Sequence, residues 1–181
     1  MQMDSVLDTI RSRRTIRRYT DADVSDDQIR DILLAGMSAP SLMDRRPWHF
    51  VVIRDPEARH LIAEELRLHP QLEGAPVLIA VLGDIAGSPT WRLDLSAAVE
   101  NMLLAAAGMG LGSAWINATN AALVEHSRIR EALCIPLHLA PFAIVAVGHA
   151  AETRPEHEMD PYFVSTRVHY DTWGNRATND R

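Results

Sequence analysis

The sequence contains no lysine, and all 18 of its basic residues are arginine. This absence excludes enzymes that form a Schiff base on a lysine and nucleotide-binding P-loops, because both depend on a lysine amine. The single cysteine, Cys134, excludes an intrachain disulfide and suits a reducing compartment. No apolar run approaches the roughly 18 residues of a membrane span. We therefore expect one globular domain of 181 residues located in the cytoplasm.

Acidic residues outnumber basic ones by 24 to 18, and the formal net charge is −6. An acidic chain repels phosphate backbones, which argues against a general nucleic-acid binder. Five of the arginines nevertheless fall within residues 11–18. A guanidinium group suits bidentate binding of phosphate. Composition alone favours a solvated charge cluster, because aspartates such as Asp8 and Asp21 flank this segment.

The hydrophobic pattern predicts about five helices interleaved with four strands. Helices are expected over residues 4–12, 25–39, 55–68, 91–108 and 121–133, and strands over residues 48–54, 76–84, 113–117 and 142–149. Ser25 to Gln28 forms a capping-box pattern, and Asp55 precedes a proline suited to the first helical position. The chain becomes polar and irregular from Ala150 onward, and we expect this arm to pack on a partner subunit.

Several motifs lack the context that their chemistry needs. The GMGLGS stretch at residues 108–113 follows a predicted helix and leads into a strand, whereas dinucleotide-binding glycines follow a strand and open a helix. These glycines therefore indicate a helix C-cap. The eight histidines are scattered without an HExxH motif, so no metal site is predicted. Serine-hydrolase chemistry lacks a GxSxG elbow.

Five blocks of sequence, in this order and spacing, resemble the FMN-dependent nitroreductase family, and the short length resembles its compact branch. The blocks are RRTIRRY (13–19), APSLMDRRPWHFVVI (39–53), LDLSAAVENMLLAAAGMGLGSAWI (93–116), FAIVAVGH (142–149) and RVHYDTWG (167–174). The resemblance implies an α+β fold of three layers, with a central mixed sheet wrapped by helices. It also implies an intertwined homodimer with FMN sites at the interface, in which residues 1–181 form one domain and residues 150–181 embrace the partner.

The function implied by the resemblance is an NAD(P)H oxidoreductase that uses FMN to reduce nitroaromatic, quinone or similar small acceptors in a ping-pong cycle. FMN supplies the chemistry, so no side chain is expected to act as an acid or base. Two alternatives remain open. A flavin-destroying or dehalogenating branch of the same fold has lid segments that are not evident here. A flavin-binding or redox-sensing protein without significant turnover is the alternative outside the enzyme class.

Matching the family's RRSxR block assigns the first FMN contacts. Arg13 and Arg14 correspond to the phosphate and ribityl contacts, and Thr15 stands where serine is usual. Arg17 corresponds to the contact at the pyrimidine edge, where a cation stabilises negative charge on the reduced flavin.

The family's PSxxNxQPW block implies ring contacts from the second subunit. The corresponding residues here are Pro40, Ser41, Leu42, Met43 and Asp44. Asp44 replaces the family asparagine, and Arg46 replaces the glutamine. An ionised aspartate only accepts hydrogen bonds, and its charge opposes an anionic reduced flavin. Arg45 and Arg46 are the candidate compensating partners.

Two further parts of the site are implied by the same resemblance. The backbone around Ile116 and Asn117 is expected to approach the flavin ring. The family often has a basic phosphate ligand at the position of Tyr162, and Arg154 or Arg167 is the candidate substitute. The acceptor pocket is expected in the loops at 66–74 and 84–92, whose sequences predict neither the acceptor nor the choice between NADH and NADPH.

Overall fold

A four-stranded sheet lies at the centre of the molecule in the computed structural model, which describes residues 6–66, 69, 72–117, 127–155 and 163–176. The strands lie in the order β1 (Trp48–Ile53), β2 (Val77–Asp84), β4 (Leu139–Gly148) and β3 (Gly112–Asn117). All three strand pairings are antiparallel. The α+β class is confirmed. Within the described residues, the parallel part of the expected mixed sheet is limited to an isolated bridge between Thr15 and Ser113.

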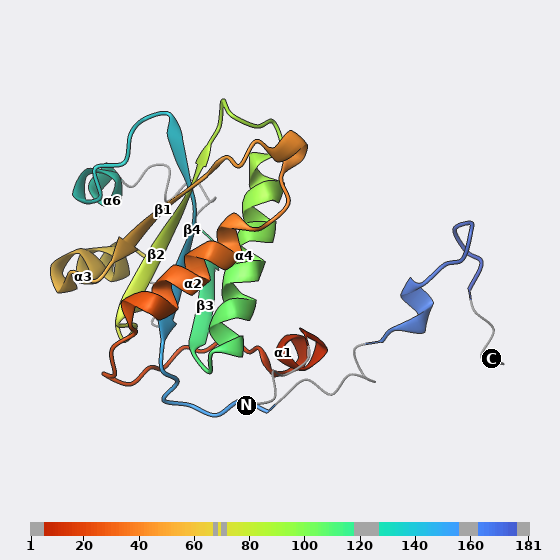
Figure 1. The fold of residues 1–181 in the computed structure, drawn as a ribbon, viewed down its shortest axis with the longest axis horizontal. Helices are drawn as coiled ribbons and strands as arrows, with labels where there is room; N and C mark the ends of the chain where they lie inside the picture. The colour runs from red at the N-terminus through yellow and green to blue at the C-terminus, as the bar shows by residue number, and fades with distance from the viewer. Residues whose placement is uncertain (1–5, 67–68, 70–71, 118–126, 156–162, 177–181) are drawn as a thin grey trace.

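Helices cover both faces of this sheet, as Figure 1 shows. One face packs against α2 (Asp26–Met37) and α4 (Trp91–Gly108), and the other against α3 (Pro56–Glu65) and α6 (Ser127–Ala132). The short helix α1 (Val6–Ser12) lies beside α4. The helices and strands lie where the sequence pattern predicts them. The first part of the helix expected over residues 121–133 lies outside the described residues.

The strand β2 is buried on both faces, which explains its continuous apolar sequence. Val77, Ile79 and Val81 belong to the core between the sheet and the helices α2 and α4. Leu78, Ala80 and Leu82 belong to the core on the opposite face. Because side chains alternate along a strand, these six residues join the two cores. The prediction of a strand covered on both faces is confirmed.

A β-bulge changes the direction of side chains where β2 pairs with β4. The register shifts between Val81 and Leu82, which pair with Ala143 and Pro141. Phe142 therefore lies at the extra position, and both Phe142 and Ala143 belong to the core that contains α4. The bulge places the Phe142 ring 5.8 Å from the ring of Trp115 on β3. An aromatic wall is thus built beside α4.

The glycines after α4 have two different structural roles. Gly110 has a φ of +74° and follows the helix end, where the N–H of Leu111 donates to the carbonyl of Ala106. This geometry confirms the predicted helix C-cap. Gly112 allows a close approach instead, because a Cβ atom there would lie 2.8 Å from a side-chain carbon of Ile16. Gly112 therefore lets the arginine segment pack directly against β3.

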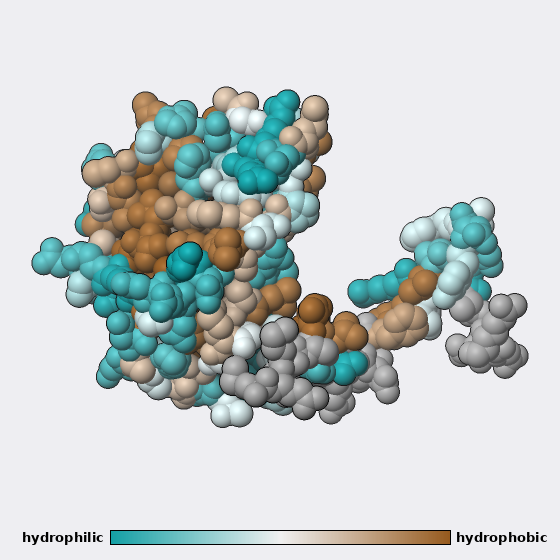
Figure 2. All heavy atoms as spheres, viewed as in Figure 1, coloured by the Kyte–Doolittle hydropathy of each residue, from teal (hydrophilic) through white to brown (hydrophobic). Residues whose placement is uncertain are grey.

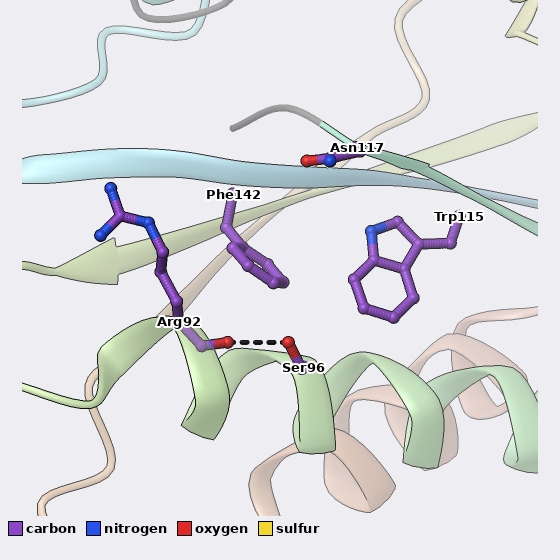
Figure 3. Close-up of a pocket in the computed structure, with 5 residues that line it drawn as sticks. All are labelled: Arg92, Ser96, Trp115, Asn117 and Phe142. Carbon is purple, nitrogen blue, oxygen red and sulfur yellow. Dashed lines mark hydrogen bonds between the residues drawn. The ribbon is translucent and has the colours of Figure 1, made fainter. Parts of the chain in front are cut away.

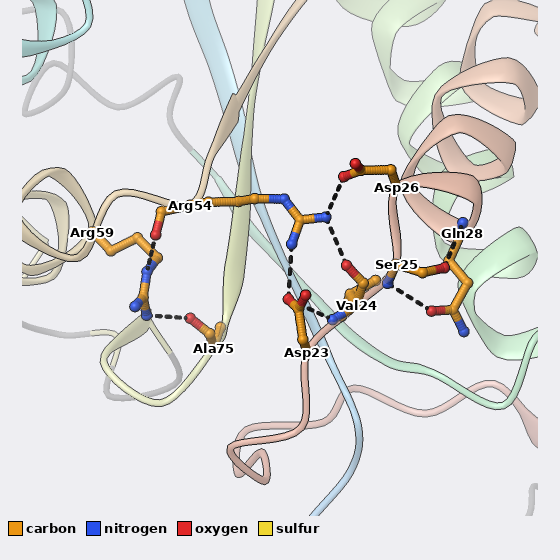
Figure 4. A network of polar contacts seen from close by, with 8 residues as sticks. All are labelled: Asp23, Val24, Ser25, Asp26, Gln28, Arg54, Arg59 and Ala75. Carbon is orange, nitrogen blue, oxygen red and sulfur yellow. Dashed lines mark hydrogen bonds and ion pairs between the residues drawn. The ribbon is translucent and has the colours of Figure 1, made fainter.

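Arg54 joins the end of β1 to the start of α2, as Figure 4 shows. Its guanidinium donates to the carboxylates of Asp23 and Asp26 and to the carbonyl of Val24, at 2.6 to 3.0 Å. The predicted capping box is present, because Ser25 and Gln28 each accept the other's backbone N–H. Caps and this arginine together define the position of α2 against the sheet.

The C-terminal segment 163–176 lies apart from the body of the molecule (Figure 1). Figure 2 shows apolar surface both on the body and on this segment. The exposed apolar side chains of the segment are those of Phe163, Val164, Tyr170 and Trp173. Among the described helices, none combines the length and apolar character that crossing a membrane requires.

Candidate functional site

The arginine segment at residues 13–17 is fixed against the edge of the sheet. Thr15 forms the parallel bridge with Ser113, and the N–H of Ile16 donates to the Ser113 carbonyl at 3.0 Å. The Ile16 side chain is buried, whereas the arginines on either side of it reach the surface. Because Ile16 is buried and its neighbouring arginines are not, this segment holds a row of positive charge against the edge of the sheet.

A pocket of about 200 Å³ lies beside this anchored segment. It is lined by Ser12, Arg13, Arg14, Ile16, Ala107, Gly110, Leu111, Ser113 and Arg154. Arg13 lies 3.7 Å from the Glu100 carboxylate, too far for a strong charge-assisted hydrogen bond. The Ser113 side-chain oxygen is buried and has no hydrogen-bond partner in the described part of the chain. Three guanidinium groups and an unsatisfied hydroxyl make this pocket suited to a phosphate-sized anion.

Glu152 organises the cations around this pocket. Its carboxylate accepts the backbone N–H of Arg17 at 2.6 Å and that of Arg18 at 3.3 Å. It also pairs with Arg154 at 3.0 Å. The Arg17 backbone hydrogen bond lowers the pKa of Glu152, and Arg154 adds to this effect against the opposing influence of desolvation. Burial, followed by the Glu152 charge, raises the pKa of the nearby Tyr19.

The structure separates the two candidates for the C-terminal basic ligand. Arg154 lines the pocket together with Arg13 and Arg14. Arg167 belongs to the short helix η3 (Ser165–Arg167) in the C-terminal segment and does not line the pocket. Tyr162 lies outside the described residues. The Arg17 side chain is exposed and lines neither this pocket nor the larger one described next.

A second, larger pocket of about 520 Å³ lies between α4 and the strands β3 and β4. In Figure 3, the Trp115 and Phe142 rings point toward α4, which contributes Arg92 and Ser96. Asn117 completes the lining. The Arg92 guanidinium lies 4.3 Å from the ring centre of Trp91 and has no ion pair among the described residues. The pocket therefore offers a wall of two tilted aromatic rings with a cation at its rim.

The two pockets lie along one face of β3. Ser113 lines the small pocket, and Trp115 and Asn117 line the large one. Asn117 lies four residue steps along the strand from Ser113, or roughly 13 Å at about 3.3 Å per residue. The Ile116 side chain belongs to the core on the opposite face. Ile116 can therefore contribute only backbone to this side of the sheet.

The segment from Pro40 to Arg46 has an unusual backbone. Met43, Asp44 and Arg46 have φ values of +50°, +56° and +47°. This left-handed conformation costs a residue with a side chain roughly 1–2 kcal/mol, less for an aspartate. The segment includes the short helix η1 (Leu42–Asp44), and the Ser41 hydroxyl accepts the N–H of Arg46 at 3.0 Å.

Asp44, the residue that departs from the family pattern, is paired in the structure. Its carboxylate accepts two hydrogen bonds from Arg46, at 2.6 and 2.9 Å. This hydrogen bonding raises the pKa of the Arg46 guanidinium, with a further contribution from the Asp44 charge. Arg45 instead donates to the carbonyl of Gly87 at 3.0 Å. Of the two candidate compensating partners, Arg46 is the one that faces Asp44.

The two predicted cofactor-binding blocks lie at opposite ends of α4. Ala107 lines the arginine pocket near the C-terminal end of the helix, and Leu42 donates its N–H to Asp94 near the N-terminal end. The 13 residues between these helix positions span about 20 Å. Within one chain, Pro40 to Asp44 and Arg13 to Arg17 are therefore not brought together.

Sequence matching missed several residues of these pockets. Ser113, Trp115 and Phe142 were predicted only as parts of strands, and Glu152 only as part of the arm. The alternation of polar and apolar residues in SAWIN is a signal that places Ser113 and Asn117 on one face. No comparable signal exists for Phe142, whose direction depends on the bulge. No group of three or more potential metal ligands occurs within the described ranges.

Comparison with known proteins gives consistent matches. The family model named Nitroreductase family matches residues 10–71 and 60–149. A protein of Archaeoglobus fulgidus with the provisional name NADH dehydrogenase/NAD(P)H nitroreductase is 36% identical over 175 residues, covering 94% of this chain and all of that protein. A structure from Bacteroides thetaiotaomicron with the same provisional name has a TM-score of 0.87 at 34% identity, covering 94% of this chain and 99% of that one.

A further similar structure contains a flavin. It is a structure from Desulfovibrio desulfuricans with the provisional name nitroreductase, in complex with FMN, and it has a TM-score of 0.75 at 34% identity. The alignment covers 89% of this chain and 96% of that one. The family model alone matches well over half of the sequence. With the fold, these matches show that the chain belongs to the nitroreductase family.

Proposed function

We propose that this protein is an FMN-dependent NAD(P)H oxidoreductase. The observation that supports this function most directly is the arginine pocket, which Arg13, Arg14 and Arg154 line together with Ser113, whose buried hydroxyl is unsatisfied. A terminal phosphate carries the negative charge and the acceptor oxygens that guanidinium groups bind. The names of the relatives, including an FMN reductase of Bacillus subtilis, support the same cofactor.

The two pockets suggest how the cofactor lies. Arg13, Arg14 and Arg154 would hold the phosphate, and Trp115 and Asn117 would lie beside the flavin ring. The roughly 13 Å of strand between the pockets leaves room for the ribityl chain. The cofactor supplies the hydride transfer between the reduced nicotinamide and the acceptor. The protein's residues bind it, orient it and set its electrostatic surroundings.

A second copy of the chain completes each site in this proposal. The family resemblance assigns Pro40 to Asp44 to the flavin bound mainly by the other subunit. Their position about 20 Å along α4 from the arginine pocket separates them from the phosphate bound by their own chain. The exposed apolar residues of segment 163–176 supply surface that a partner would bury. Arg17 and Arg167 line neither of the two pockets described above, and in this proposal they contact the flavin in the assembled dimer.

The acceptor in this proposal is a small, flat molecule such as a nitroaromatic compound or a quinone. The larger pocket supports this class because Trp115 and Phe142 form an aromatic wall. The alternative of a flavin-binding protein without turnover drew its support from Asp44 and the missing basic residue at position 162. Arg46 pairs with the Asp44 carboxylate, and Arg154 supplies a basic group, so both arguments lose force.

The visible spectrum of the purified protein tests this proposal. We expect a yellow protein, or one that becomes yellow with added FMN, whose absorbance near 450 nm bleaches anaerobically with NADH or NADPH. A nitroaromatic compound or a quinone should then restore the colour. A colourless protein that takes up no FMN would refute the flavin assignment. A yellow protein that neither nicotinamide bleaches would support binding without turnover.

A further inference from the structure

The carboxylate of Asp94 occupies an unusual position at the start of α4. The residue is only 6% exposed. Its two oxygens accept hydrogen bonds from the Ser88 hydroxyl at 2.8 Å and from the Thr90 hydroxyl at 3.2 and 3.3 Å. A third donor is the backbone N–H of Leu42 at 3.2 Å. Leu42 lies 52 residues earlier in the sequence, so Asp94 connects two distant segments.

An ordinary helix-terminal role does not explain this arrangement. An acidic residue in the first turn of a helix commonly stabilises the helix dipole, and it needs no distant partner for that. The N-cap residue Thr90 makes no side-chain capping hydrogen bond. Its hydroxyl donates to Asp94 instead, as does the fully buried Ser88. Both hydroxyls therefore help to orient a carboxylate that reaches out of its own helix.

The segment that Asp94 contacts is the strained one. Leu42 immediately precedes Met43 and Asp44, which have left-handed backbone conformations. Such conformations persist only where the surroundings hold them. Two described hydrogen bonds connect this segment to residues outside it. Leu42 donates its backbone N–H to Asp94, and Arg45 donates to the Gly87 carbonyl. Both reach the same stretch of chain, residues 84–94.

We propose that Asp94 is a positioning residue that holds segment 41–46 in its left-handed conformation and couples it to the loop at residues 84–90. The functional part of this proposal rests on the proposed flavin function, because segment 41–46 is the block assigned to the flavin of the partner subunit. The loop at residues 84–90 leads directly into α4, whose Arg92 lines the larger pocket. A ligand that stabilises segment 41–46 therefore also stabilises the loop at residues 84–90, and the reverse, through Asp94.

Hydrogen exchange in the flavin-free protein tests the structural part. In Asp94→Ala, the Leu42 amide loses a charged acceptor and should exchange roughly tenfold faster or more. Asp94→Asn keeps one acceptor oxygen and should remain close to the wild type. Asp55→Ala is the matched control, since Asp55 also accepts a backbone N–H at the start of a helix, that of Ala58, but contacts neither segment 41–46 nor residues 84–94 in the described hydrogen bonds. Unchanged Leu42 exchange in Asp94→Ala would overturn the proposal.

A milder variant keeps the test decisive if Asp94→Ala does not fold. Ser88→Ala with Thr90→Val removes both hydroxyl donors but leaves the carboxylate. The freed carboxylate should be less well oriented, and Leu42 exchange should rise roughly threefold. Equal exchange in this variant and the wild type would again overturn the proposal.

FMN affinity then separates the positioning role from the flavin assignment. We expect Asp94→Ala to bind FMN roughly tenfold more weakly than wild type, and Asp94→Asn to recover most of this loss. Faster Leu42 exchange with unchanged FMN affinity would support the positioning of the segment but refute its contact with the flavin. Weaker FMN binding with unchanged Leu42 exchange would refute the role of Asp94 in holding the segment.

Discussion

The two ends of α4 hold their predicted cofactor contacts in different ways. At the C-terminal end, the arginine segment is held by backbone pairing with Ser113 and by Glu152, which accepts two backbone N–H groups. At the N-terminal end, segment 41–46 is held by individual contacts of Asp94 and Arg45. Its backbone is left-handed at three positions. One block is built into the sheet, and the other is a strained loop attached to it.

The two blocks also differ in how closely they match the family pattern to which the sequence was compared. The arginine block keeps the family pattern apart from Thr15, a conservative change in a residue that bridges to β3. The loop has two departures, Asp44 and Arg46, which form a bidentate pair on the exposed surface. Because they pair with each other, the two substitutions compensate locally.

The largest expected effect concerns the proposed dimer, which would bring segment 41–46 of one chain to the flavin bound at the arginine pocket of the other. Deleting residues 156–181 leaves Glu152 and Arg154 in place but removes the exposed apolar segment. We expect a monomer or an aggregate that binds no FMN, because each flavin would lose the loop of the partner. Light scattering and flavin absorbance measure the result. A well-behaved yellow dimer of the truncated chain would contradict both the arm and the shared site.

The next effect concerns the arginine end alone. Arg13→Ala should weaken FMN binding about tenfold to a hundredfold, since a charge-assisted contact contributes roughly 1.5–3 kcal/mol. Riboflavin, which has no phosphate, should bind equally to the variant and the wild type. Arg18→Ala is the control, because Arg18 is mostly exposed and does not line the pocket. An equal loss of riboflavin affinity would place Arg13 elsewhere than at the phosphate.

The role of Glu152 at the C-terminal end of α4 predicts that the stability of the folded protein depends on pH in the acidic range. The pKa of Glu152 is lowered in the folded protein, so its stabilising contribution is present above the ordinary value of 4.5. That contribution is lost as pH falls below this value and through the lowered pKa. Urea unfolding at pH 7 and pH 3.5 should therefore show a larger loss of stability in wild type than in Glu152→Gln. Identical pH profiles would exclude this linkage.

The smallest expected effect concerns the loop end. Asp44→Asn leaves Arg46 unpaired and should raise the flavin potential, whereas Arg46→Gln leaves Asp44 unpaired and should lower it. Each shift should be at most about 20 mV, because an exposed pair contributes about 1 kcal/mol or less and 30 mV corresponds to about 1.4 kcal/mol for two electrons. The double variant should return to the wild-type potential. Shifts of the same sign in both single variants would show that the pair does not compensate.

The predictable part of the fold follows from local patterns. The capping box at Ser25, the helix end at Gly110 and the doubly buried strand β2 each depend on neighbouring residues, and the structure confirms all three. Candidate site residues could be assigned from the sequence only where a contiguous block matched the family. Arg154 could not be distinguished from Arg167 by sequence, because the choice depends on how the chain turns back after β4 to meet the arginine segment.

The sequence by itself determined the order of elements, the family and the concentration of positive charge at residues 11–18, because periodicity and block order are properties of neighbouring residues. Tertiary structure alone decided which arginines share a pocket, that Arg46 rather than Arg45 neutralises Asp44, and that Asp94 contacts Leu42. It also placed Phe142 beside Trp115 through a bulge. These outcomes depend on contacts between residues distant in sequence, which the packing of α4 against the sheet brings together.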